Sequence, residues 1–138
     1  MKRPLWTSIF VSLIFLASLE GVLGKDPTPP KKTPELLTQG KKLYEQNCVP
    51  CHGPKGDAKG PLAPSLKPAP SDFAEPLNKW PNTKGEPQKI FDVISKGIPN
   101  SAMVKWDHLP EQERWALVYA VSEFATPGKA APPAKKKK

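Results

Sequence analysis

Proline limits the folds open to this chain more than any other residue, with 19 among 138 residues. Because proline has no amide N–H to donate, this content excludes a long-helix or coiled-coil protein and a regular central sheet. The hydrophobic share is only 38%, which is typical of disorder unless a non-protein group completes the core. The composition therefore leaves either a disordered chain or a small fold whose core is completed by such a group.

The positive charge of the chain is concentrated at its C-terminal end. Lys129 and residues 135–138 supply five charges of the formal net charge of +8. Between Asp26 and Thr126, thirteen Lys and Arg stand against twelve Asp and Glu. A nucleic-acid-binding domain would spread its basic residues over a folded face, so no nucleic acid is expected as a partner.

Residues 1–24 have the pattern of a secretory signal peptide, which predicts a periplasmic protein. Lys2 and Arg3 precede a mostly apolar run over residues 5–19, and Val22 and Gly24 form a small-residue cleavage site. The alternative is an uncleaved membrane anchor. The apolar run has about fifteen residues, fewer than the roughly twenty that span a bilayer.

The remaining chain divides into three parts. Residues 25–33 form a Pro-rich linker, residues 34–126 form the domain, and residues 127–138 form a Pro/Ala/Lys tail that we expect to be disordered. Within the domain, Thr33 and Pro34 predict the start of a first helix. Further helices are predicted over residues 87–96 and about 110–125, with a long irregular segment over residues 50–81.

The most informative motif is C-x-x-C-H at Cys48, Cys51 and His52. Two thiols at i and i+3 can each add across one vinyl group of a haem, and the adjacent histidine can bind the iron. The alternatives are a thioredoxin-like redox pair, half of a zinc site, or a disulfide. A redox pair is expected beside a βαβ pattern, and a zinc site needs about four ligands, of which the sequence offers only His108 in addition.

The sequence resembles the class I cytochrome c family over residues 34–125. With the predicted helices, this resemblance implies an all-α fold of three or more helices wrapped around one covalent haem c per chain. It also implies that the first helix crosses the last. Pro64 would offer its carbonyl to Nδ1 of His52, and Leu66 would contact the haem. Apart from the haem motif, the matching features are Gly40 and Tyr44, the residues 63–66, the loop over residues 97–103 and the residues 113–118.

Two positions depart from the family pattern. The family often has proline directly after the ligand methionine, whereas this chain has Val104. The last helix of the family often carries an aromatic residue at the position of Ala120, whereas here the aromatic residue is Tyr119, one step earlier.

Met103 is the predicted sixth iron ligand. It is the single methionine left after Met1 is removed with the signal peptide, and it lies in an irregular loop 51 residues beyond His52. The alternatives are His108 as the ligand, an open iron site, or a methionine that only fills the core. Trp80 is either a core residue or a donor to a haem propionate through its indole N–H.

The resemblance implies a single-electron carrier that passes electrons between respiratory redox proteins and transforms no substrate. The first alternative is a haem subunit fixed to a respiratory complex. The second is a peroxidase-like or gas-binding haem protein. We expect a monomer, and we expect weak electrostatic contact of the lysine tail with acidic partners or a membrane surface. Lys55, Lys59 and Lys105 mark either a docking face for a partner or an ordinary solvated surface.

Overall fold

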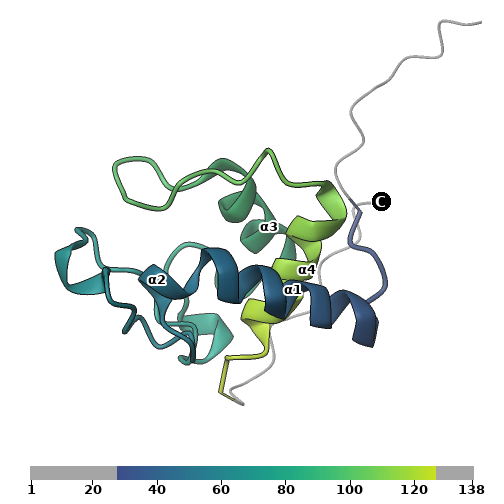
Figure 1. The fold of residues 1–138 in the computed structure, drawn as a ribbon, viewed down its shortest axis with the longest axis horizontal. Coiled ribbons are helices and arrows are strands. Elements are labelled where there is room, and N and C mark those ends of the chain that lie inside the picture. The colour runs from purple at the N-terminus through teal and green to yellow at the C-terminus, as the bar shows by residue number, and fades with distance from the viewer. Residues whose placement is uncertain (1–27, 127–138) are drawn as a thin grey trace, which may run out of the picture.

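The computed structural model describes residues 28–126, so the predicted signal peptide and the lysine tail lie outside it. The structure is all-α, as expected, and residues 28–126 contain no strand (Figure 1). None of the helices in this range is long and apolar enough to cross a bilayer. The elements are α1 (Pro34–Asn47), α2 (Val49–His52), 3₁₀ helices at Ala63–Ser65 and Leu77–Lys79, α3 (Pro87–Lys96) and α4 (Glu111–Ser122).

The start of α1 follows from its first residues. The hydroxyl of Thr33 accepts a hydrogen bond from the Leu36 N–H at 3.2 Å, and Pro34 occupies the first turn, where no N–H is needed. Glu35 places a negative charge at the positive end of the helix dipole. The predicted start is confirmed, and the other end of α1 leads directly into the cysteine motif.

Helices α1 and α4 cross in direct backbone contact (Figure 1). A Cβ atom on Gly40 would lie 2.0 Å from the carbonyl oxygen of Ala116 and 3.1 Å from Cβ of Ala120. The small residues Ala116 and Ala120 therefore pack against Gly40, and the expected crossing of the first and last helices is confirmed. Tyr119 faces elsewhere, because its hydroxyl donates a hydrogen bond to the carbonyl of Pro30.

Helix α4 is shorter than predicted, because it ends at Ser122 and not near Ala125. Beyond it, the N–H groups of Glu123 and Phe124 bond to carbonyls three residues back, which is a tighter turn than the α-helix makes. This turn takes Phe124 away from the helix axis. Its ring then packs against Tyr44 of α1, with the ring centroids 4.9 Å apart.

The protein core lies between α1, α3 and α4. Phe91 of α3 stacks on Trp115 of α4 at a centroid distance of 4.4 Å. The guanidinium of Arg114 lies over the Phe91 ring, 4.8 Å from its centroid. The large side chains that are almost fully buried are Trp115, Tyr44, Leu117 and Val118. This core is small, and beside it the structure leaves a large cavity.

The segment before α1 lies against α4. Besides the bond from Tyr119 to Pro30, Lys32 forms an ion pair with Glu123 at 2.5 Å. Residues 28–33, which fall within the predicted linker, contain no regular secondary structure. Two side-chain contacts nevertheless fix this part of it to the domain.

Candidate haem-binding site

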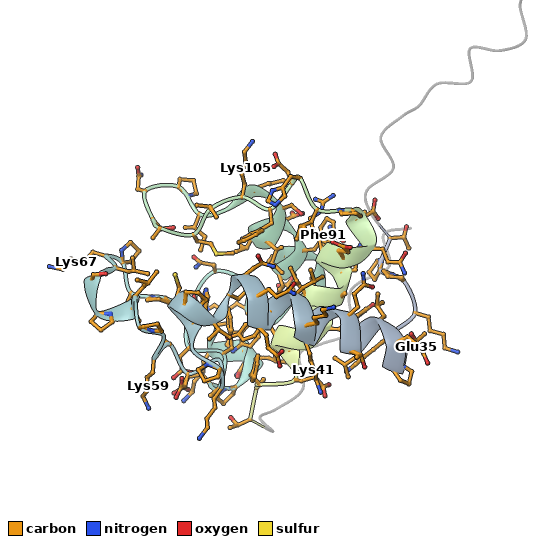
Figure 2. The ribbon with its side chains drawn as sticks, viewed as in Figure 1. Glu35, Lys41, Lys59, Lys67, Phe91 and Lys105 are labelled. Atoms are coloured by element: carbon orange, nitrogen blue, oxygen red, sulfur yellow. The ribbon has the colours of Figure 1, made fainter. Side chains whose placement is uncertain are left out.

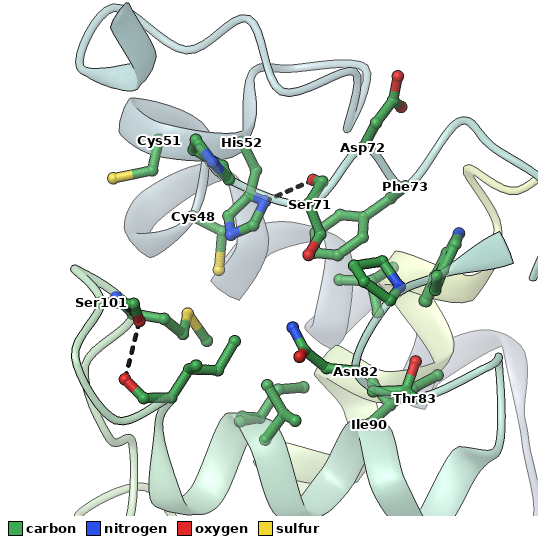
Figure 3. Close-up of a pocket in the computed structure, with 18 of the residues that line it drawn as sticks. Cys48, Cys51, His52, Ser71, Asp72, Phe73, Asn82, Thr83, Ile90 and Ser101 are labelled. Carbon is green, nitrogen blue, oxygen red and sulfur yellow. Dashed lines mark hydrogen bonds between the residues drawn. The ribbon is translucent and has the colours of Figure 1, made fainter. Parts of the chain in front are cut away.

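The end of α1 and the short helix α2 carry the cysteine motif. The N–H groups of Cys51 and His52 both bond to the carbonyl of Cys48, at 3.2 and 2.8 Å. This turn places residues i, i+3 and i+4 on one side of the helix. The side chains of Cys48, Cys51 and His52 are half-buried, and all three line one cavity (Figure 3).

The cavity has a volume of about 530 Å³, within the range of roughly 300–1,000 Å³ that holds small molecules and cofactors. Opposite the motif, its wall is formed by α3, where Figure 3 shows Ile90. The lining is mostly apolar, which suits the flat macrocycle of a haem. The branched aliphatic lining residues are Leu66, Ile90, Val93, Ile94, Ile98, Val104, Leu117 and Val121.

The hydrogen bond of His52 determines which ring nitrogen is free. Its Nδ1 lies 3.1 Å from the carbonyl oxygen of Ser71 (Figure 3). A carbonyl oxygen can only accept a hydrogen bond, so Nδ1 carries the proton and Nε2 keeps its lone pair for a metal. Burial lowers the pKa of His52, while the bond to Ser71 acts in the opposite direction. The net effect favours the neutral imidazole, which is the form that binds iron.

Ser71 holds the position that the resemblance assigned to Pro64, and that assignment is corrected here. Pro64 is exposed in the 3₁₀ helix Ala63–Ser65 and does not line the cavity. The N–H of Phe73 bonds to the carbonyl of Gly56 at 2.6 Å. This bond draws the segment over residues 71–73, and not the one containing Pro64, against His52.

Met103 lines the same cavity as the cysteine motif, although the sequence separates them by about fifty residues. Its loop is closed by its own backbone, because the N–H of Ile98 bonds to the carbonyl of Met103 at 3.1 Å. Gly97 begins this loop with φ +71°, and a Cβ there would lie 2.6 Å from the Met103 oxygen. Only glycine fits such a position without strain.

His108 does not reach the cavity. It is exposed and lies beside Trp106, with the ring centroids 5.4 Å apart. Of the two candidate sixth ligands that the sequence offered, the structure brings only Met103 to the haem motif.

Trp80 and Leu66 both line the cavity. The indole N–H of Trp80 is already used within the protein, because it donates to the carbonyl of Glu75 at 2.9 Å. The predicted bond from Trp80 to a haem propionate is therefore not supported, and the buried ring is a wall residue. Leu66 is half-buried and placed to contact a bound group.

The alternative readings of the cysteine motif find little support. Burial and the neighbouring Cys51 raise the pKa of Cys48 to about 12, whereas a redox-active cysteine needs a lowered pKa. Residues 28–126 contain no group of three or more His, Cys, Asp and Glu placed to hold a metal ion.

The three lysines considered for docking, Lys55, Lys59 and Lys105, are all exposed. Figure 2 shows Lys59 and Lys105 projecting outwards from opposite sides of the molecule. Lys59 is 3.6 Å from Asp57, and Lys105 is 2.9 Å from Asp107. Both lysines are thus partly neutralised by a neighbouring acid, which weakens the case for a strongly basic docking face.

Comparison with known proteins agrees with this site. A family model described as cytochrome c oxidase, cbb3-type, subunit III matches residues 35–119. Among solved structures, the reducing HAO-like protein complex of Kuenenia stuttgartiensis is similar, with 33% identity and a TM-score of 0.57. The match covers 71% of this chain and 45% of that one, so this chain spans less than half the length of its structural relative. No curated protein matches the sequence.

The family match covers more than half of the chain and includes the whole C-x-x-C-H motif. The family implies a covalently bound haem c, and the cavity beside Cys48, Cys51 and His52 fits that group. The chain belongs to the c-type cytochrome family described as cytochrome c oxidase, cbb3-type, subunit III.

Proposed function

We propose that this protein is a single-electron carrier with one covalent haem c and His/Met axial ligation. The observation that carries this proposal is the convergence of Met103 and the C-x-x-C-H motif on one apolar cavity. Cys48 and Cys51 would hold the haem by thioether bonds, and His52 and Met103 would bind its iron. With the iron bound by both residues, no position would be left for oxygen or peroxide, and the proposal is therefore a carrier and not an enzyme.

Haem c supplies a one-electron couple between Fe(III) and Fe(II). The protein contributes the ligands and their environment. Ser71 holds His52 in the tautomer that exposes Nε2, and the soft thioether of Met103 favours the reduced state. The apolar walls from α3 and α4 exclude water, which also raises the potential.

The proposal includes an exported, monomeric protein that meets other redox proteins outside the cytoplasm. The signal-peptide pattern of residues 1–24 supports export, and haem c is attached outside the cytoplasm. The lysine-rich tail adds a screened electrostatic attraction to acidic partners or an anionic membrane surface.

A second candidate is a haem subunit fixed to a respiratory complex. Two observations favour it: the matched family is described as an oxidase subunit, and the similar solved structure is a complex. Fractionation of cell envelopes separates the two candidates. A carrier is recovered free in the soluble fraction, whereas a fixed subunit stays with the membranes or co-purifies with other chains.

A redox titration of the haem-loaded protein, followed by visible spectra, tests the carrier function. We expect one reversible one-electron transition, the same low-spin character in both states, and slow binding of carbon monoxide to the reduced protein. Rapid binding of carbon monoxide, or steady turnover of peroxide, would instead favour the enzymatic alternative.

A further inference from the structure

We infer that Phe73 is a positioning residue that fixes the plane of the His52 imidazole. The inference deepens the proposed function and rests on His52 as an iron ligand. No pattern in the sequence predicts this role for Phe73, which is the one phenylalanine between residues 50 and 81.

The rings of His52 and Phe73 are stacked. Their centroids are 4.4 Å apart, and their planes differ by 15°. Figure 3 shows the Phe73 ring beside His52, with Ser71 next to it. Such an aromatic pair is more favourable than the burial of its area alone, so the stack favours one orientation of the His52 ring over the others.

The hydrogen bond to Ser71 cannot fix this orientation alone. It directs Nδ1 of His52 towards one carbonyl oxygen, but the ring can still turn about the N–H···O line. The terminal torsion of a histidine side chain has broad minima, so it resists this turning only weakly. The face of Phe73 removes the remaining freedom, because a turned imidazole would lose the stack or collide with the ring.

Phe73 is itself held on two sides. Its N–H donates to the carbonyl of Gly56 at 2.6 Å. Its ring also packs on Trp80, with the centroids 5.0 Å apart and the planes at 46°. Trp80 is only 2% exposed, and its indole N–H is bonded to the Glu75 carbonyl. The buried, hydrogen-bonded indole of Trp80 therefore supports the Phe73 ring, which in turn packs on His52.

One short segment provides both restraints on His52. Ser71 supplies the carbonyl and Phe73 supplies the ring, two residues apart in the chain. Partners of this kind, which contact a ligand and not the metal, set the orientation and basicity of the ligand. The plane of an axial imidazole governs how unpaired spin of Fe(III) spreads over the four haem pyrroles, and proton NMR of the haem methyl groups measures that spread.

The test compares three variants of the haem-loaded protein. Phe73→Leu removes the aromatic face and keeps an apolar side chain. Phe73→Tyr keeps the aromatic face and adds a hydroxyl at a position that is only half-buried. Phe91→Leu is the matched control, because Phe91 stacks on Trp115 at the same 4.4 Å but does not line the cavity. Figure 2 shows Phe91 against α4, within the helical core.

We expect Phe73→Leu to change the pattern of the four haem methyl shifts in the oxidised protein and to shift the reduction potential. Phe73→Tyr should restore the wild-type pattern, and Phe91→Leu should lower stability while leaving the pattern unchanged. A wild-type pattern in Phe73→Leu would overturn the inference. So would an equal change in Phe91→Leu, because it would mean that any loss of core packing turns the ligand.

A measurement on the wild type keeps the inference testable if Phe73→Leu does not accumulate. In the diamagnetic reduced protein, we expect cross-relaxation between the ring protons of His52 and Phe73, and its absence would overturn the inference.

Failure of the proposed function is seen separately, before any variant is made. Wild-type protein without the spectrum of histidine-ligated low-spin iron would exclude His52 as the ligand, and with it any role of Phe73 in positioning one.

Discussion

The backbone of Gly40 in α1 touches the backbone of Ala116 in α4, and the space at Gly40 admits no side chain larger than a hydrogen atom. This contact sets how closely the two helices cross. Because α1 leads directly into the haem motif and α4 contributes Leu117 and Val121 to the cavity wall, the crossing also fixes the width of the cavity.

Substitution Gly40→Ala should destabilise the protein strongly. The added Cβ would lie 2.0 Å from a carbonyl oxygen, and backbone cannot move aside as a flexible side chain does. Overpacking typically costs about 1–3 kcal/mol, and we expect a value at or above the upper end. Denaturant unfolding measures this change. Lys41→Ala, an exposed change on the same helix, is the control and should stay within about 0.5 kcal/mol.

Replacement of both Cys48 and Cys51 by alanine should prevent covalent attachment and the stable fold that depends on it. The cavity of about 530 Å³ would otherwise remain as unfilled apolar space. Acid-acetone extraction is the measurement, and it should leave the haem with the wild-type polypeptide. Haem that extracts freely from the wild type would show that the thioether bonds do not exist.

The ion pair of Lys32 with Glu123 should make the docking of the N-terminal segment depend on pH. The hydrogen bond from Lys32 holds the pKa of Glu123 below its ordinary value of 4.5. A lowered folded-state pKa stabilises the fold above the unfolded pKa, and this contribution is lost as the pH falls through the folded value. The loss therefore sets in around pH 4.5 and continues down to the lowered folded value.

Glu123→Gln should flatten the pH dependence of the unfolding free energy in that window. Both partners are substantially exposed, so the cost at neutral pH should stay below about 1 kcal/mol. Lys32→Gln should give the same flattened profile, because either change removes the pair. A profile as steep as that of the wild type in both variants would assign the pH dependence to other carboxylates.

Deletion of residues 135–138 should lower the rate of association with an acidic redox partner at low salt. Four lysines attract a negative surface over a distance that salt shortens, so the effect should vanish at high ionic strength. Stopped-flow kinetics measures the rates, and the reduction potential should not change. Equal rates at low salt, with several acidic partners, would mean that the tail is only solvated.

Local signals in the sequence predicted much of this fold. Thr33 with Pro34 marks the start of α1, and Gly97 marks the end of α3, because caps depend on a few neighbouring residues. The C-x-x-C-H motif is equally local, since three side chains within one helical turn form half of the site. The crossing at Gly40 followed from the family resemblance, and the structure identified Ala116 and Ala120 as its partners.

The rest of the site depends on the path of an irregular chain. Any residue offers a backbone carbonyl, so the sequence could not distinguish Ser71 from Pro64 as the acceptor for His52. The stack of Phe73 and the internal bond of Trp80 likewise arise from how residues 71–80 fold back on α2. No periodicity exists in such a segment from which these contacts could be predicted.

The Met103→Ala variant tests the central claim most directly. Oxidised wild-type protein should show the weak near-red charge-transfer band of an Fe(III)–thioether bond. Met103→Ala should abolish this band, lower the potential and let cyanide or carbon monoxide bind quickly, because the sixth position loses its ligand. His108→Ala is the control and should do none of these, since His108 lies outside the cavity. An unchanged band in Met103→Ala, together with an altered iron spectrum in His108→Ala, would contradict the His/Met assignment and indicate a low-potential bis-histidine carrier.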